Sequence, residues 1–178
     1  LEARDAGEYD MVVVGAGIAG MSAAVSAARL GLRVALIGDR PVAGGNNSSE
    51  VRVHMGGRLG VGPYPKLGQL QQEFAPCREG NAQPAAYEDQ KKMQWLQQEH
   101  GVSLFMGVHA DGVTMDGTRI ASITARNVLS GERRRFKAPL YADCTGDATI
   151  GYLAGADWRM GRESRSEYGE SRAPERAD

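Results

Sequence analysis

Residues 10–45 read DMVVVGAGIAGMSAAVSAARLGLRVALIGDRPVAGG, and this stretch decides the fold. The apolar run 11–14 predicts a buried strand, and the glycine-rich turn 15–20 follows it directly. The Ala-rich, Pro-free segment 21–30 then predicts a helix that packs on a sheet. Residues 33–37 form a second apolar strand at the spacing of a right-handed crossover. The sequence therefore predicts a nucleotide-binding βαβ unit.

The glycines of the turn meet three separate steric demands. Gly15 permits the tight turn, Gly17 lets the backbone approach a pyrophosphate, and Gly20 lets the helix pack close to the strand. The N–H groups that open the helix have no partner within it, and the helix dipole adds partial positive charge there. We therefore expect the whole turn to contact a diphosphate: Gly15, Ala16, Gly17, Ile18, Ala19 and Gly20. The alternative is a Rossmann-like unit that holds no ligand.

The composition is that of one globular domain. The 178 residues suit a single sizeable core, and 21 Lys and Arg against 22 Asp and Glu leave a formal charge of −1. That balance gives no reason to expect a nucleic-acid partner. No apolar run approaches the ~20 residues of a transmembrane helix. Cys77 and Cys144 form no CxxC pair, so we expect two free thiols and no metal site.

The rest of the chain predicts more of the parallel sheet and an added antiparallel part. Two helices and a third core strand are expected at residues 66–77, 87–100 and 102–106. Alternating segments separated by Gly-containing turns predict an antiparallel meander over residues 107–115, 119–129 and 133–137. A last apolar strand and helix are expected at residues 139–143 and 148–154. The fold class is therefore α/β: a Rossmann-like parallel sheet with helices, plus an antiparallel β-meander.

Further turns should meet the glycine turn at the carboxyl ends of the parallel strands, where doubly wound sheets bind ligands. Asp39 follows the second strand at about the offset of an acid that binds ribose hydroxyls; otherwise it is a solvated turn residue. The loop of Gly44, Gly45 and Asn46 suits close backbone contact with a ligand, or is only a flexible connection. In the turn of Thr145, Gly146 and Asp147, the acid either accepts a hydrogen bond from a ligand hydroxyl or caps the following helix.

Four segments together resemble a known family. They are VVVGAGIAG at 12–20, DRPVAGGN at 39–46, SSEVR at 48–52 and DCTGD at 143–147. They are similar to the FAD-dependent oxidoreductase family of the glutathione-reductase-type flavin fold. Within it they look like the bacterial subgroup with a DRPxxGGNxSSEVR-like run. The resemblance covers nearly the whole chain, through Arg162, and is far more specific than the glycine motif alone.

The resemblance implies FAD as the cofactor, with its diphosphate at residues 15–20. It implies that the adenosine lies near Asp39 and Arg40 and that the adenine meets the backbone at Val108. By the same implication, Gly44, Gly45 and Asn46 approach the diphosphate and the flavin, while Thr145, Gly146 and Asp147 lie on the ribityl or diphosphate side. Gly38 occupies the place at which many relatives carry the ribose-binding acid.

The chemistry that the resemblance implies belongs to the isoalloxazine ring of a non-covalently held FAD. His54, beside a Gly-rich loop, is the candidate catalytic residue, because histidine titrates near neutral pH. The substrate is expected to be a small molecule of unknown identity. An NAD(P)-dependent dehydrogenase and a noncatalytic nucleotide-binding module remain as alternatives. The Gly44–Gly45 loop and the turn at Gly146 favour a flavin over a nicotinamide cofactor.

The two ends of the chain are polar. We predict a flexible tail over residues 1–8, an incomplete FAD-binding domain over residues 9–160, and a polar tail over residues 161–178. The family's substrate domain is not visible, so we expect a C-terminally truncated fragment whose last residues lead toward that domain. The chain starts at Leu1 without a signal-type segment, so we expect a soluble protein, either cytoplasmic or exported with its leader removed. The oligomeric state is left open.

Overall fold

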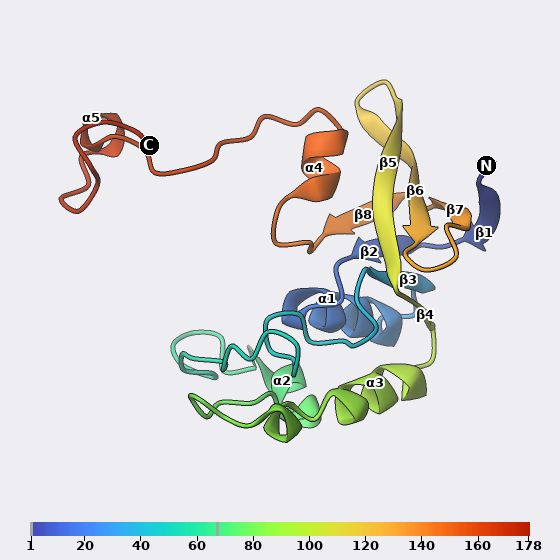
Figure 1. Cartoon of the computed structure of the whole chain (residues 1–178), viewed down its shortest axis with the longest axis horizontal. Helices are drawn as coiled ribbons and strands as arrows, with labels where there is room; N and C mark the ends of the chain where they lie inside the picture. The colour runs from blue at the N-terminus through green and yellow to red at the C-terminus, as the bar shows by residue number, and fades with distance from the viewer. Residues whose placement is uncertain (1, 67) are drawn as a thin grey trace.

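The computed structural model describes residues 2–66 and 68–178 (Figure 1). Leu1, in the predicted N-terminal tail, and Leu67, in the predicted helix 66–77, lie outside the described residues. The elements in chain order are β1 (Arg4–Glu8), β2 (Met11–Val14), α1 (Ile18–Arg29), β3 (Val34–Gly38), α2 (Gln69–Phe74), the 3-10 turn η1 (Pro84–Tyr87), α3 (Asp89–Gln98), β4 (Val102–Met106), β5 (Val108–Asp116), β6 (Arg119–Asn127), β7 (Arg133–Lys137), β8 (Leu140–Asp143), α4 (Thr149–Leu153) and α5 (Arg165–Tyr168).

The first sheet is parallel and has the strand order β4-β3-β2-β8. Strand β2 lies in the middle, with Val12 beside Ala35 on one side and Tyr141 on the other. Helix α1 makes the crossover from β2 to β3, and every residue of β3 is buried. Such continuous apolar strands are typical of a sheet covered on both faces. The predicted α/β Rossmann-like fold is confirmed.

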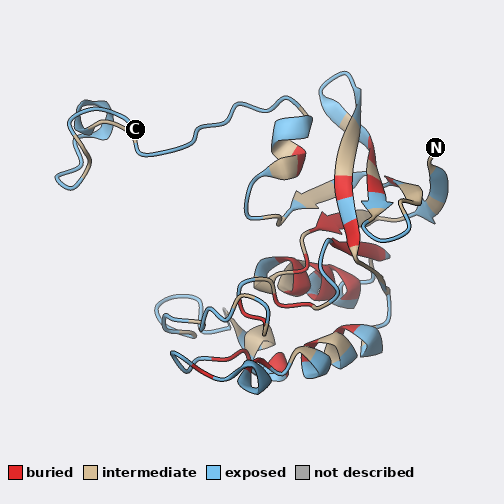
Figure 2. Ribbon diagram, viewed as in Figure 1, coloured by how far each residue is buried: buried red, intermediate tan, exposed pale blue. Residues whose placement is uncertain are grey.

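The two faces of the parallel sheet are covered by different layers. On one face, Val13 and Leu36 pack in a core cluster with Met21 of α1, Phe74 of α2 and Leu96 of α3. On the other face, a second cluster joins the parallel strands to the antiparallel sheet: it contains Val12, Ile37, Val108, Ile123 and Phe136. Figure 1 shows this order of layers, with α1, α2 and α3 on one side and β5 to β7 on the other. The buried residues gather in β2, β3 and α1 (Figure 2).

The second sheet has the order β1-β7-β6-β5, and its antiparallel pairs are the predicted meander. Strand β1 was not predicted, because residues 1–8 were expected to be a flexible, frayed tail. The structure instead pairs β1 in parallel with β7, with Arg4 opposite Arg134. As an edge strand, β1 needs backbone hydrogen bonds and few apolar side chains, so its polar composition does not prevent pairing. The ring of Tyr9, just after it, lies 6.2 Å from that of Phe105.

The predicted helices are present, and α2 and α3 are shorter than expected. Helix α2 covers only the middle of residues 66–77, because Gly68 before it and Ala75 after it adopt left-handed backbone conformations. Helix α3 begins at Asp89, and Tyr87 belongs to the 3-10 turn that precedes it. Residues 161–178 contain the short exposed helix α5, and in Figure 1 this segment extends away from the sheets. Within the described residues, no helix is both long and apolar enough to cross a membrane.

Candidate cofactor-binding site

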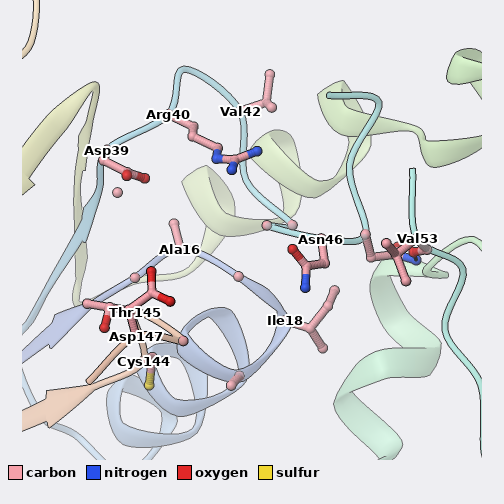
Figure 3. Close-up of a pocket in the computed structure, with 18 of the residues that line it drawn as sticks. Ala16, Ile18, Asp39, Arg40, Val42, Asn46, Val53, Cys144, Thr145 and Asp147 are labelled. Carbon is pink, nitrogen blue, oxygen red and sulfur yellow. Dashed lines mark hydrogen bonds between the residues drawn. The ribbon is translucent and has the colours of Figure 1, made fainter. Parts of the chain in front are cut away.

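A cavity of about 540 Å³ opens at the carboxyl ends of β2, β3 and β8. Four stretches of chain line it: 15–19, 38–47 without Pro41 and Ala43, 53–55 and 144–147. Figure 3 places Asp39 and Asp147 toward one end of the cavity and Asn46 and Val53 toward the other. This is the edge of a doubly wound sheet at which ligands bind. The structure therefore brings together the segments that the sequence predicted to converge.

The glycine turn presents bare backbone to this cavity. Helix α1 begins at Ile18 with Gly17 as its N-cap, and no side chain caps it. The N–H groups of its first turn are therefore left for a ligand. Gly15 has a φ of 105°, and a Cβ there would overlap the carbonyl oxygen of Cys144. A Cβ on Gly20 would overlap the carbonyl oxygen of Gly15, which is the close packing of helix and strand predicted for this position.

The loop after β3 closes against the glycine turn through backbone alone. The Gly44 N–H donates to the carbonyl of Ala16 at 2.8 Å, and Gly44 forms a bridge with Gly17. Gly44 and Gly45 have φ values of 116° and 59°, a region that favours glycine. A Cβ on Gly45 would lie 2.9 Å from the Cα of Gly17. The two walls of the cavity thus meet where side chains are excluded, which fits the diphosphate of a dinucleotide.

Buried polar side chains hold this loop from behind. The Ser48 Oγ donates to the Gly45 carbonyl at 2.7 Å. The Asn47 amide donates to the carbonyls of Val53 at 3.0 Å and Cys77 at 2.8 Å, and it accepts from the Cys77 N–H. Asn47 and Ser48 are both buried. These hydrogen bonds fix the conformation of the loop. The alternative considered from the sequence, a flexible connection, does not describe it.

The structure leaves no room for an acidic side chain at Gly38, the place at which the resemblance led us to expect one. Gly38 ends the buried strand β3, and a Cβ there would lie 2.7 Å from the Cβ of Ala16. No carboxylate fits at that position in this chain. Asp39 is the first acid after the strand; its side chain is 61% exposed, and its Oδ2 lies 4.0 Å from the Nδ1 of His109. Arg40 lines the same end of the cavity and lies 3.5 Å from Glu50.

Two acids follow one another closely at the end of β8, Asp143 and Asp147. The sequence offered two roles for Asp147, as a helix cap or as a ligand-binding residue. Asp143 holds the start of α4, since its Oδ2 accepts from the N–H groups of Ile150 at 2.8 Å and Gly151 at 3.0 Å. Its Oδ1 accepts from the hydroxyl of Thr145 at 2.7 Å. Asp147 lines the cavity, and α4 has no side-chain cap on its N-cap residue, Ala148. The capping role predicted as one alternative for Asp147 belongs to Asp143.

Replacing Asp143 by alanine is expected to lower the free energy of unfolding by about 1–2 kcal/mol at neutral pH. Burial raises the pKa of this carboxyl, but the hydrogen bonds from Thr145, Gly151 and Ile150 outweigh burial and hold the pKa below 3.8. The stabilisation is therefore present above that value and is lost as the pH falls through the lower folded-state pKa. Urea unfolding at neutral pH and at about pH 3 measures it.

The matched control for Asp143→Ala is Asp147→Ala, in the same turn, which should leave the unfolding free energy unchanged. Equal losses in the two variants would contradict the assignment of the capping role.

The remaining predicted residues fall into three positions. His54 lines the cavity between Val53 and Met55. Val108 is buried and lines a smaller adjoining cavity of about 100 Å³, together with Asp39 and Asp147. Gly20 lies outside the lining residues and packs closely against Gly15. The further lining residues were not predicted from the sequence to bind a ligand: Val42, Asn47, Val53, Met55 and Cys144.

Comparisons with known proteins agree with this geometry. A model of the family described as FAD dependent oxidoreductase matches residues 10–177. Similar solved structures include L-proline dehydrogenase from P. horikoshii (TM-score 0.51, 17% identity, 82% of this chain and 24% of that chain). The myxobacterial chondrochloren halogenase CndH, an FAD-dependent halogenase, is also similar (0.53, 16%, 80% and 38%). A third is a geranylgeranyl bacteriochlorophyll reductase-like protein from Thermoplasma acidophilum (0.56, 21%, 88% and 44%).

These likenesses show a shared fold. The chain spans less than half of the length of each of these three structures, from 24% to 44%. No curated protein matches the chain significantly.

Proposed function

The chain belongs to the FAD dependent oxidoreductase family, and from that premise we propose that it is the FAD-binding portion of a flavin-dependent oxidoreductase acting on a small molecule. Its cofactor is FAD. The observation that carries the proposal is the cavity at the carboxyl ends of β2, β3 and β8, whose walls meet at Gly17 and Gly45 without side chains. That shape suits a diphosphate held by backbone N–H groups at a helix start.

Each end of the cavity offers different groups to a bound dinucleotide. We assign the adenosine to the end with Asp39, Arg40 and Val108, because an acid there accepts from ribose hydroxyls and Val108 lines an adjoining smaller cavity. The opposite end, with Asn46 and His54, then faces the flavin. Asp147 lies at the same end as Asp39 (Figure 3) and is available for a hydroxyl of the bound dinucleotide, since Asp143 already caps α4. These assignments follow the direction in which the resemblance orients FAD.

FAD, when bound, supplies hydride or electron transfer through its isoalloxazine ring. The chain's own residues bind and orient it: the first N–H groups of α1 neutralise the diphosphate, and Gly44 and Gly45 exclude side chains from it. His54 is proposed as the group that holds or moves a proton beside the flavin.

We place the substrate-binding part of the enzyme outside these 178 residues and the chain within the glutathione-reductase-type subgroup. The low coverage of the similar structures supports the first placement, and the DRPVAGGN and SSEVR runs support the second.

The absorbance spectrum of the purified chain tests the proposal. We expect the bands of oxidised flavin, either as purified or after FAD is added and the excess is removed. Acid precipitation should release the flavin into the supernatant as intact FAD, because no covalent bond is proposed at His54. A colourless protein that rejects FAD but is protected against unfolding by NAD would support the dehydrogenase alternative instead. Flavin that stays in the pellet would contradict non-covalent binding.

A further inference from the structure

A lysine is completely buried behind the cavity. Lys92, on α3, has no exposed surface. Its Nζ donates to the carbonyl of Asn47 at 2.6 Å and to the carbonyl of Tyr87. The nearest carboxylate is that of Asp89, whose Oδ1 lies 3.9 Å from the Nζ. Lysine is almost never fully buried unless it is paired, so the position of this ammonium group requires a physical reason.

Lys92 contacts the loop that forms one wall of the cavity. The ammonium group bonds to the carbonyl of Asn47, directly after the Gly44–Gly45–Asn46 segment. The aliphatic part of the side chain packs against Gly44, where an added Cβ would be 3.2 Å from the Lys92 Cδ. Gly44 in turn bonds to Ala16 of the glycine turn. A short, continuous chain of contacts therefore runs from Lys92 to the floor of the cavity.

A second contact ties the same loop to the same helix. The Asp89 carboxylate, at the start of α3, accepts from the Ser49 N–H at 3.1 and 3.2 Å and from the Ser49 hydroxyl. Helix α3 thus holds the loop at Asn47 and at Ser49. Asn47 itself lines the cavity, whereas Ser49 does not.

The geometry points to Lys92 as a positioning residue for FAD: through Asn47 and Gly44 it holds the Gly44–Gly45 wall against the glycine turn. The inference rests on the proposed placement of the diphosphate on the bare backbone where these two walls meet. A site preorganised in this way does not have to order the loop when the ligand binds, which raises affinity.

The chemistry of the site argues against a purely stabilising role. Burial lowers the pKa of Lys92, with Asp89 opposing that shift. The folded state therefore disfavours the charge relative to the unfolded chain, whose ordinary lysine pKa is 10.5. An apolar side chain of similar length would avoid that desolvation, whereas it has no N–H to hold the Asn47 carbonyl. Lysine at this position therefore supplies the N–H donor that holds the Asn47 carbonyl, although burial disfavours its charge.

The test compares Lys92→Met with Lys91→Met in the chain loaded with FAD. Lys91 is the adjacent residue on α3, is half-exposed and pairs with Glu88 at the surface, so it is a matched control. At a temperature at which far-UV circular dichroism shows both variants folded, we expect Lys92→Met to weaken FAD binding about tenfold or more. We also expect it to change the visible circular dichroism of the bound flavin. Lys91→Met should match the unsubstituted chain in both measurements.

An unchanged FAD affinity and an unchanged flavin signal in folded Lys92→Met would overturn the inference. If that variant does not fold, Asp89→Asn removes the charge-assisted tether to Ser49, and a loss of affinity of a few fold is expected. Unchanged binding in Asp89→Asn would then overturn the inference. Failure of the unsubstituted chain to bind FAD, or full binding by a Gly17→Val variant, would instead contradict the proposed site.

Discussion

Gly17→Val is expected to abolish FAD binding while leaving the chain folded. Gly17 has a φ of −73°, which any residue adopts, so the backbone imposes no strain on a side chain there. An added Cβ meets only the Cα of Gly45, at 3.8 Å, which is ordinary contact. The valine methyl groups would then cover the bare backbone beside the start of α1, in the space assigned to the diphosphate. We expect a loss of at least about 100-fold in affinity, or roughly 2.7 kcal/mol.

Flavin content after purification and titration with added FAD measure the effect of Gly17→Val. Gly56→Val is the matched control, because Gly56 lies in a nearby loop outside the cavity lining and an added Cβ there meets nothing within 4 Å. The control should bind FAD as the unsubstituted chain does. Unchanged flavin content in folded Gly17→Val would contradict the site, and loss of folding would contradict the reasoning about its backbone.

The parts of the fold that could be predicted from the sequence are those specified by local patterns. The βαβ unit over residues 10–45 follows from apolar runs and one glycine turn, and the meander follows from alternation and Gly-containing turns. Strand β1 could not be found in this way, because its partner β7 is distant in the chain and its own residues are polar. Its formation depends on backbone hydrogen bonds, which carry no sequence signal.

The site divides in a similar way. Its glycines were predictable because each needs a special backbone conformation or a close approach, and the sequence marks both. The polar residues that hold the loop and the start of α4 were not predictable. Lys91 and Lys92 are chemically identical neighbours, yet one is at the surface and the other is fully buried. The orientation of α3 about its axis decides which of the two lysines faces the loop, and the sequence does not specify that orientation. Likewise Asp143 and Asp147 look alike in the sequence, and the hydrogen bonds of α4 decide which one is the cap.

Gly20→Ala is expected to destabilise the fold severely, although rules of helix propensity predict the opposite. Gly20 lies within α1, where alanine in place of glycine is ordinarily worth about 1 kcal/mol of stabilisation. Here the added methyl group would overlap the carbonyl oxygen of Gly15 and lie 3.3 Å from the Cβ of Cys144. Both neighbours belong to the turns at the strand ends, and the Gly15 oxygen is backbone that no rotamer change can move.

The steric term should therefore exceed the propensity term in Gly20→Ala, and we expect a net loss of roughly 3 kcal/mol or more of unfolding free energy. Urea unfolding monitored by far-UV circular dichroism measures it, with Ser26→Ala as the control. Ser26 is exposed on the same helix, so alanine there has only the propensity effect and should leave stability unchanged or slightly raised. Gly20→Ala that is as stable as the control would mean that α1 can move away from β2. The close approach that forms the glycine turn would then not be required by the fold.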